Sequence, residues 1–268
     1  MQGFLEKILA STSEDLVARK RQTTLDELKA AVHDRAARVM AGTGEKRSLV
    51  QAVARPSISV IAEVKRASPS KGDIRPDLDV ADIVKAYEQA GAAAISVLTE
   101  PRYFKGSLDD LATARNSLTT PVPILRKDFI VDPYQIWEAA AAGADAILLI
   151  VAALDVDKLA SFQNEAAAAG LECLIEIHDA DELQIALASG ASLIGINNRD
   201  LRSFTVNLKT TLDMIGLFPD GVLVVSESGI ATSADVRMLV AAGVDAVLVG
   251  ETLMRCDDPG AGLRKLLA

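Results

Sequence analysis

Eight short apolar runs, rich in β-branched residues, recur along the chain from residue 59 onward, and a longer stretch with helical periodicity follows each of them. Strands that alternate with helices are typical of successive βα units, and eight such units are the number that closes an α/β barrel. We expect strands at residues 60–65, 94–99, 123–128, 146–151, 173–177, 193–197, 223–228 and 246–250. The sequence therefore predicts a single (β/α)8 TIM barrel.

Glycines at the ends of four predicted helices support this repeated architecture. Gly91, Gly143, Gly190 and Gly243 each stand just before a predicted strand. Glycine adopts the left-handed conformation that ends a helix at little cost. Because the same helix-to-strand junction recurs, we favour repeated βα units over a doubly wound sheet.

The first 56 residues have a different character. They are mainly helical in pattern, and Ser11 with Glu14 and Thr24 with Glu27 have the spacing of capping boxes at helix starts. We expect residues 1–56 to form an N-terminal helical extension packed on a barrel of residues 57–268. No second linker is evident, so the two parts should make one structural domain.

The composition limits the possible partners. The formal net charge is -9 and the pI about 4.9, whereas a nucleic-acid binder needs surplus Lys and Arg to displace counterions. No apolar run has the length of a membrane span, and the N-terminus lacks the pattern of a secretory signal. We expect a cytoplasmic protein that binds neither nucleic acid nor membrane.

The histidines and cysteines give no sign of a metal site. His33 and His178 have no second histidine at ligand spacing, and Cys173 and Cys256 do not belong to a CxxC pair. We expect neither a metal nor a cofactor.

Two charged side chains stand at the end of the first predicted strand. Side chains alternate along a strand, so Glu63 and Lys65 point to the same face. Burying such charges costs on the order of several kcal/mol each unless they are paired or used. They form either a structural ion pair or one wall of an active site.

Further polar residues stand at the ends of other predicted strands. In a barrel of this kind the carboxyl ends of all strands meet at one face, where active sites are built. We therefore expect a common pocket that contains Glu63, Lys65, Lys127, Glu176, Asn197, Arg199, Glu227 and Ser228.

The loops after the last two strands indicate a phosphate site. Gly229 and Gly250 lie where barrel enzymes often hold phosphate, since glycine lets backbone N–H groups approach the anion. Ser68, in the loop after the first strand, can add a hydroxyl. The alternative is that both glycines only make tight turns. Phe104 and Phe129 also follow strand ends, where they either clamp an aromatic ring or pack in the core.

Six motifs in order resemble the indole-3-glycerol phosphate synthase family. They are IAEVKRASPSKG from Ile61, EPRYFKGS from Glu100, LRKDFI from Leu125, LIEIH from Leu174, IGINNRDL from Ile194 and VSESGI from Val225. The resemblance extends over the whole predicted barrel, and a helical N-terminal extension is also a family feature. It implies a carboxy-lyase of tryptophan biosynthesis that needs no cofactor.

The resemblance also implies a reaction and catalytic roles. The substrate would be 1-(2-carboxyphenylamino)-1-deoxyribulose 5-phosphate, which is cyclised with loss of carbon dioxide and water. Lys127 would protonate the substrate carbonyl, and Lys65 would pair with the substrate carboxylate and donate a later proton. Glu176 would act as the base in the dehydration. The residues implied to orient these groups are Glu63, Asn197, Arg199 and Glu227.

The remaining implied residues bind substrate. Phe104 and Phe129 would flank the anthranilate ring, Arg199 and Ser228 would contact the substrate, and the phosphate would be held by Ser68, Gly229, Gly250 and Glu251. Two positions depart from the family pattern. Asp73 stands where an apolar residue is expected, and Glu251 stands where some members carry serine, so its phosphate contact must come from the backbone N–H.

Three other functions remain open. A Schiff-base aldolase would also need a barrel lysine and a phosphate site, a phosphoribosylanthranilate isomerase would need a cysteine at the end of the first strand, and a catalytically inactive phosphosugar-binding protein would need no intact lysines. We expect the cyclase, acting on its small-molecule substrate as a monomer.

Overall fold

The computed structural model describes residues 3–40, 47–201 and 203–268. In it, eight parallel strands close into a barrel in chain order, and the last strand pairs with the first. The strands are β1 (Ser59–Val64), β4 (Ala94–Leu98), β5 (Ile124–Lys127), β6 (Ala146–Ile150), β7 (Glu172–Ile177), β8 (Leu193–Asn197), β9 (Leu223–Glu227) and β10 (Ala246–Val249). Each predicted strand matches an observed one, with its ends shifted by at most one residue. The predicted (β/α)8 barrel is confirmed.

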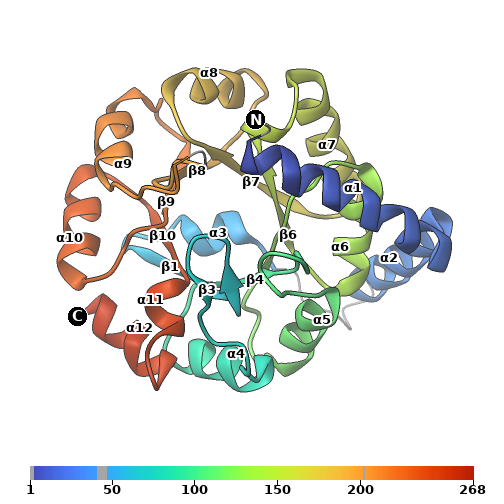
Figure 1. Cartoon of the computed structure of the whole chain (residues 1–268), viewed down its shortest axis with the longest axis horizontal. Coiled ribbons are helices and arrows are strands. Elements are labelled where there is room, and N and C mark those ends of the chain that lie inside the picture. The colour runs from blue at the N-terminus through green and yellow to red at the C-terminus, as the bar shows by residue number, and fades with distance from the viewer. Residues whose placement is uncertain (1–2, 41–46, 202) are drawn as a thin grey trace.

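Helices surround the barrel, as Figure 1 shows. They are α4 (Val80–Gln89), α5 (Leu108–Ser117), α6 (Pro133–Ala142), α7 (Val156–Ala168), α8 (Ala180–Ala188), α9 (Lys209–Met214), α10 (Ser233–Ala242), α11 (Glu251–Met254) and α12 (Pro259–Leu267), with single 3-10 turns η1 (Val151–Ala153) and η2 (Ile215–Leu217). A small hairpin of β2 (Ala67–Ser68) and β3 (Gly72–Asp73) lies in the loop after β1. The four predicted glycine stops all have positive φ: 86° at Gly91, 101° at Gly143, 81° at Gly190 and 99° at Gly243.

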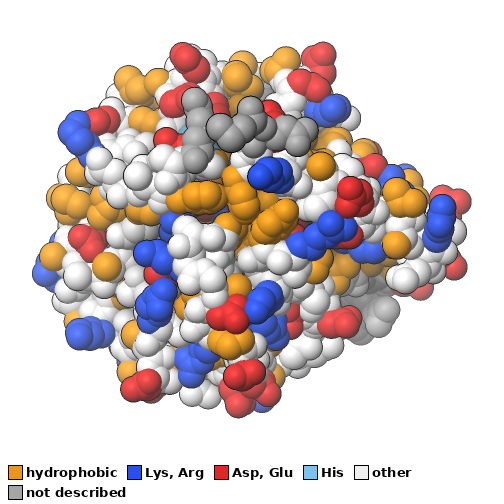
Figure 2. All heavy atoms as spheres, viewed as in Figure 1, with side chains coloured by type: hydrophobic (Ala, Val, Ile, Leu, Met, Phe, Trp, Pro, Cys, Tyr) orange, Lys and Arg blue, Asp and Glu red, His pale blue; other side chains and the backbone are white. Residues whose placement is uncertain are grey.

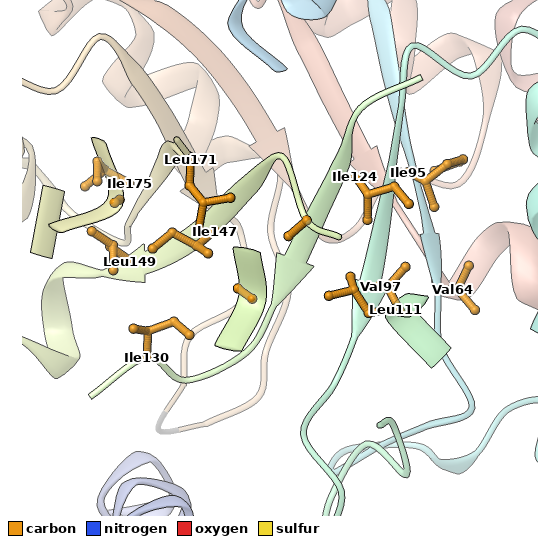
Figure 3. Close-up of a cluster of buried hydrophobic side chains, with 14 of the residues drawn as sticks. Val64, Ile95, Val97, Leu111, Ile124, Ile130, Ile147, Leu149, Leu171 and Ile175 are labelled. Carbon is orange, nitrogen blue, oxygen red and sulfur yellow. The ribbon is translucent and has the colours of Figure 1, made fainter. Parts of the chain in front are cut away.

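The alternation of side chains along each strand divides the apolar residues into two layers. On β6, Ile147 and Leu149 point outward to the helices, and Figure 3 shows them in the buried cluster between strands and helices. Leu148 and Ile150 point into the barrel, where they belong to a second buried cluster, the inner cluster. The same alternation on β1 places Glu63 on the inward face with Ile61.

The helical extension comprises α1 (Phe4–Gln22), α2 (Leu25–Met40) and α3 (Leu49–Val53). Helix α1 starts over the barrel in Figure 1 and places Ile8 in the inner cluster, whereas α2 packs on α6. Leu49 and Val53 of α3 also join the inner cluster. We propose residue 57 as the boundary between this extension and the barrel.

One of the two predicted capping boxes is right. The backbone N–H of Thr24 donates to Oε2 of Glu27 at 2.7 Å, and the N–H of Glu27 donates to Oγ1 of Thr24 at 3.3 Å. The prediction for Ser11 and Glu14 is wrong, because Ser11 lies inside α1 and its hydroxyl donates to the carbonyl of Ile8. Among the described residues, no helix is long and apolar enough to cross a membrane.

Candidate active site

A cavity of about 590 Å³ opens at the carboxyl ends of the strands. Figure 2 looks onto this face, where hydrophobic side chains gather over the middle of the barrel and Lys and Arg side chains stand beside them. Every residue predicted for the site lines this cavity: Glu63, Lys65, Ser68, Phe104, Lys127, Phe129, Glu176, Asn197, Arg199, Glu227, Ser228, Gly229, Gly250 and Glu251. Their individual roles stay predictions.

Lys127, at the end of β5, lies between two carboxylates. Its Nζ is 3.0 Å from Oε2 of Glu176 and 3.4 Å from Oε2 of Glu227. On the other side of Glu176, the Asn197 amide donates to Oε1 at 3.2 Å. Three strands therefore hold one ammonium and two carboxylates within hydrogen-bonding or ion-pair distance.

Lys65, directly after β1, has a partner on that strand. Its Nζ donates to Oε2 of Glu63 at 2.6 Å, and both side chains are largely buried. The two residues therefore do form an ion pair, and both line the cavity, while their role as a wall of an active site stays a prediction.

The charges in this cluster shift one another's pKa values. Burial would lower the pKa of Lys127, but the negative charges of Glu176, Glu227 and Glu63 outweigh burial and raise it. Burial would raise the pKa of Glu176, but Lys127 and then His178 lower it. Burial, together with repulsion by Glu176 and Glu63, raises the pKa of Glu227 to about 8 against the attraction of Lys127. The cluster thus favours the charged form of Lys127 and of Glu176 and disfavours the charged form of Glu227.

Two glycines make room for these carboxylates. A Cβ at Gly250 would lie 2.0 Å from Oε2 of Glu63 and 3.0 Å from Nζ of Lys65. A Cβ at Gly195 would lie 2.1 Å from Oε1 of Glu227. The interpretation of Gly250 as a tight turn alone is thus incomplete, because its missing side chain admits the Glu63–Lys65 pair.

The loops predicted to hold phosphate all line the cavity. Ser228 and Gly229 have positive φ values of 68° and 85°, so the loop after β9 turns sharply at the cavity. The buried hydroxyl of Ser68 has no hydrogen-bond partner within the described part of the chain. The carboxylate of Glu251 lies 3.1 Å from Nε of Arg255 and 3.9 Å from Nη2 of Arg199. The Glu251 carboxylate is thus held by two guanidinium groups.

Asp73, the other residue that departs from the family pattern, does not line this cavity. Its exposed carboxylate is 2.6 Å from Nζ of Lys105. This ion pair lies at the surface, away from the carboxylate cluster.

Two aromatic residues also line the cavity. The Phe104 and Phe129 rings are 6.2 Å apart between centroids and tilted by 38°. Phe129 also belongs to the inner core cluster, so its ring both packs and lines the cavity. Glu100 fixes the loop before Phe104, because its carboxylate accepts the backbone N–H groups of Arg102, Tyr103 and Phe104.

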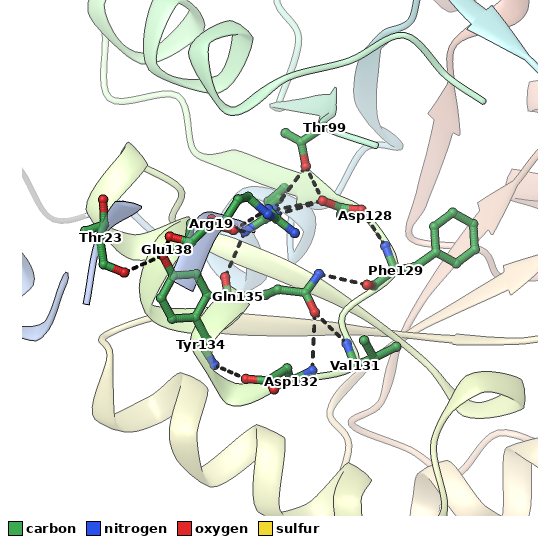
Figure 4. A network of polar contacts seen from close by, with 11 residues as sticks. Arg19, Thr23, Thr99, Asp128, Phe129, Val131, Asp132, Tyr134, Gln135 and Glu138 are labelled. Carbon is green, nitrogen blue, oxygen red and sulfur yellow. Dashed lines mark hydrogen bonds and ion pairs between the residues drawn. The ribbon is translucent and has the colours of Figure 1, made fainter. Parts of the chain in front are cut away.

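Arg126 was missed by the sequence reasoning. It lies between Leu125 and Lys127 on β5 and is fully buried. Its guanidinium donates to Asp128 at 2.8 Å and to Glu138 at 3.0 Å. Figure 4 shows Asp128, Glu138 and Arg19 in the surrounding network. Glu138 also accepts from Arg19 of α1 at 2.7 Å. The network ties the N-terminal helix to the strand that carries Lys127. Strand alternation could have revealed it, since Arg126 must face outward if Lys127 faces inward.

His178 was considered only as a metal ligand. It follows β7 two positions after Glu176, so alternation could have placed both side chains on one face. Its Nε2 lies 3.5 Å from Oε1 of Glu176. Among the described residues, no group of three His, Cys, Asp or Glu side chains could hold a metal ion. The expectation that no metal takes part stays a prediction.

Comparison with known proteins supplies the family context. Residues 5–266 match the family model described as indole-3-glycerol phosphate synthase. A protein of Burkholderia vietnamiensis named indole-3-glycerol phosphate synthase is 46% identical over 266 residues, which are 99% of each chain.

Solved structures show the same fold at low identity. The 3-hexulose-6-phosphate synthase of Salmonella typhimurium superposes with a TM-score of 0.62 at 13% identity, over 78% of this chain and 96% of its own. The thiamine phosphate pyrophosphorylase of Pyrococcus furiosus gives a TM-score of 0.60 at 17% identity, over 78% of this chain and 94% of its own. Identities this low indicate shared architecture only.

Proposed function

The chain belongs to the indole-3-glycerol phosphate synthase family, and from that premise we propose how its side chains divide the reaction among themselves. The activity is the ring closure of 1-(2-carboxyphenylamino)-1-deoxyribulose 5-phosphate to indole-3-glycerol phosphate, with loss of carbon dioxide and water. It is a carboxy-lyase reaction of tryptophan biosynthesis. The division of roles below is our proposal.

Lys127 is the general acid of the ring closure. As the ring carbon that bears the carboxylate attacks the substrate carbonyl carbon, negative charge develops on the carbonyl oxygen. The protonated ammonium of Lys127 transfers a proton to that oxygen. A positioned acid of this kind contributes roughly 10²–10⁴-fold to the rate. The observation that carries this role is the position of Lys127 Nζ, 3.0 Å from Glu176 and 3.4 Å from Glu227.

Lys65 binds the substrate carboxylate until it leaves. The bond between the ring carbon and the carboxylate then breaks, carbon dioxide departs, and the electron pair restores the aromatic ring. Glu63 holds Lys65 in place through the 2.6 Å contact of their side chains.

Glu176 and Lys65 complete the reaction by dehydration. Glu176 takes a proton from the methylene carbon next to the nitrogen, a carbon–carbon double bond forms, and the hydroxyl leaves as water with a proton from Lys65. The enzyme gives two protons and takes one. One proton per turnover therefore comes from solvent, which balances the conversion of a carboxylate into neutral carbon dioxide.

The remaining residues of the cavity bind the other parts of the substrate and orient it. We assign the anthranilate ring to Phe104 and Phe129 and the sugar hydroxyls to Asn197, Arg199 and Glu227. Ser228 contacts the substrate, and the phosphate lies against Ser68, Gly229, Gly250 and the backbone N–H of Glu251. The hydroxyl of Ser68, which has no hydrogen-bond partner among the described residues, and the sharp turn at Gly229 support the phosphate assignment.

The cellular setting follows the same proposal. The net charge of -9 disfavours binding to the negatively charged backbone of nucleic acid. The cavity suits a small-molecule substrate. We assign the enzyme to the cytoplasm and expect it to act as a monomer, because one chain supplies the whole cavity.

Substitution of Lys127 tests the acid role. Lys127→Ala is expected to abolish turnover but to bind the reduced substrate, in which the carbonyl is an alcohol, with affinity close to that of the unchanged enzyme. Lys158→Ala is the matched control, because Lys158 is exposed on α7 and pairs only with Asp155 among the described residues. Turnover by Lys127→Ala near that of the control would remove Lys127 from the acid role.

Borohydride separates this mechanism from a Schiff-base aldolase. A Schiff base needs a neutral amine, whereas the neighbouring carboxylates raise the pKa of Lys127 and keep it charged. We expect no covalent adduct when the enzyme is treated with substrate and borohydride. An adduct at Lys127 would contradict the cyclase mechanism.

A further inference from the structure

A second cavity of about 440 Å³ is lined by residues that follow β7 and β8. His178, Asp179 and Glu182 line it. Glu176 lines the main cavity and is absent from the lining of the second, whereas the reverse holds for His178. The 3.5 Å approach of Nε2 of His178 to Oε1 of Glu176 is thus a contact between the two cavities.

Glu182 fixes the imidazole from the far side. Its Oε2 accepts the backbone N–H of His178 at 2.7 Å and lies 3.1 Å from the ring Nδ1. Because Nδ1 faces a carboxylate, it carries hydrogen, and the ring can turn little about its bonds. Nε2 is then aimed at Glu176.

The Nε2 atom of His178 is buried and has no hydrogen-bond partner within the described part of the chain. A buried donor left unsatisfied costs about 1–3 kcal/mol, and catalytic hydrogen bonds often shorten only when substrate is bound. A small movement of the Glu176 carboxylate would bring Oε1 into hydrogen-bonding distance.

We propose that His178 is a positioning residue for Glu176, held by Glu182, and that it supplies the cation that stays beside Glu176 after Lys127 has given up its proton. The inference rests on the proposed function, in which Glu176 is the base. While Lys127 is neutral, the protonated imidazole and the Asn197 amide keep the Glu176 carboxylate in place.

The charges around His178 support a protonated ring. Burial would lower its pKa, but the hydrogen bond with Glu182 and the charges of Glu176, Glu182 and Glu227 raise it. Glu182 contacts the ring from α8 and Glu176 contacts it from β7, whereas Glu227 of β9 acts through its charge alone. Lys127 of β5 contacts Glu176, and Asp179 and Arg199 line the same cavity.

Imidazole NMR tests this coupling without reference to activity. The chain has two histidines, so the exposed His33 serves as an internal reference. In the unchanged enzyme we expect His178 to titrate above its ordinary pKa of 6.5, and we expect Glu176→Gln to lower the pKa of His178. Titration of His178 at or below 6.5, or no response to Glu176→Gln, would overturn the proposal.

Kinetics test the effect on the reaction. His178→Asn keeps a donor toward Glu182 but loses the one toward Glu176, so we expect kcat to fall roughly tenfold, which corresponds to about 1.4 kcal/mol, with KM little changed. His178→Gln, which restores a neutral donor toward Glu176, should recover part of the loss. His33→Asn is the matched control and should keep full activity.

Two results would reject the positioning role. Unchanged kcat in His178→Asn would do so, as would equal losses in His178→Asn and His178→Gln with a lower melting temperature in both, since that pattern indicates a structural histidine. Failure of the proposed function is separate, because it would appear as an inactive unchanged enzyme.

Discussion

Gly250→Ala tests whether the space beside the Glu63–Lys65 pair is needed for catalysis. Gly250 precedes α11, and its φ of -121° lies outside the left-handed region that favours glycine. The added Cβ would lie 2.0 Å from Oε2 of Glu63. The substitution therefore acts directly on the ion pair.

The size of the effect follows from this distance. Non-bonded atoms need roughly 3.5 Å, so the carboxylate must move by about 1.5 Å from its 2.0 Å position. A misplacement of about 1 Å can cost 10²-fold in rate. We expect kcat to fall roughly 10²-fold. The displaced atoms are the flexible end of Glu63, so the melting temperature should change by only a few degrees.

Indole fluorescence at varied substrate concentration gives kcat and KM for each variant. Gly216→Ala is the matched control, because a Cβ at Gly216 meets no atom within 4 Å. Gly195→Ala is a companion on β8 that should displace Glu227, whose Oε1 would lie 2.1 Å from the new Cβ. Gly250→Ala with the kcat of the control would refute the reasoning. A rise in KM alone would assign Gly250 to phosphate approach only.

Three further substitutions test other parts of the account. Burial lets the folded chain keep a proton on Glu227 between its ordinary pKa of 4.5 and about 8, so stability should fall as pH rises through this range. Glu227→Gln should remove that fall in urea unfolding at several pH values; an unchanged slope would contradict it. Arg126→Lys should cost about 3 kcal/mol or more by urea unfolding, since a lysine cannot satisfy Asp128 and Glu138 together, and a cost under about 1 kcal/mol would argue against the network. Glu100→Gln should loosen the loop of Phe104 and raise KM about tenfold with a smaller effect on kcat. Steady-state assays measure both constants, and an unchanged KM would refute this prediction.

The fold and the members of the site were predictable because both depend on local pattern. Strand alternation and the glycine stops are written in short stretches of sequence, and barrel topology then brings every strand end to one face. Hence all predicted residues, from Glu63 to Glu251, line one cavity.

The partners within the site were not predictable, because they depend on distances between strands. Strand alternation allowed a pair of Lys65 with Glu63, but the sequence could not show that Lys127 lies between Glu176 and Glu227. Nor could it show that Gly250 and Gly195 leave space for carboxylates. The wrong capping box at Ser11 has a related cause, since the same four-residue pattern occurs inside a helix.

The most direct measurement follows the purified enzyme with 1-(2-carboxyphenylamino)-1-deoxyribulose 5-phosphate as the sole substrate. Indole fluorescence and released carbon dioxide are recorded together, for the unchanged enzyme and for Lys127→Ala. The account predicts one carbon dioxide per indole formed, without added metal or cofactor, and no indole from Lys127→Ala. Absence of indole fluorescence with the unchanged enzyme would contradict it.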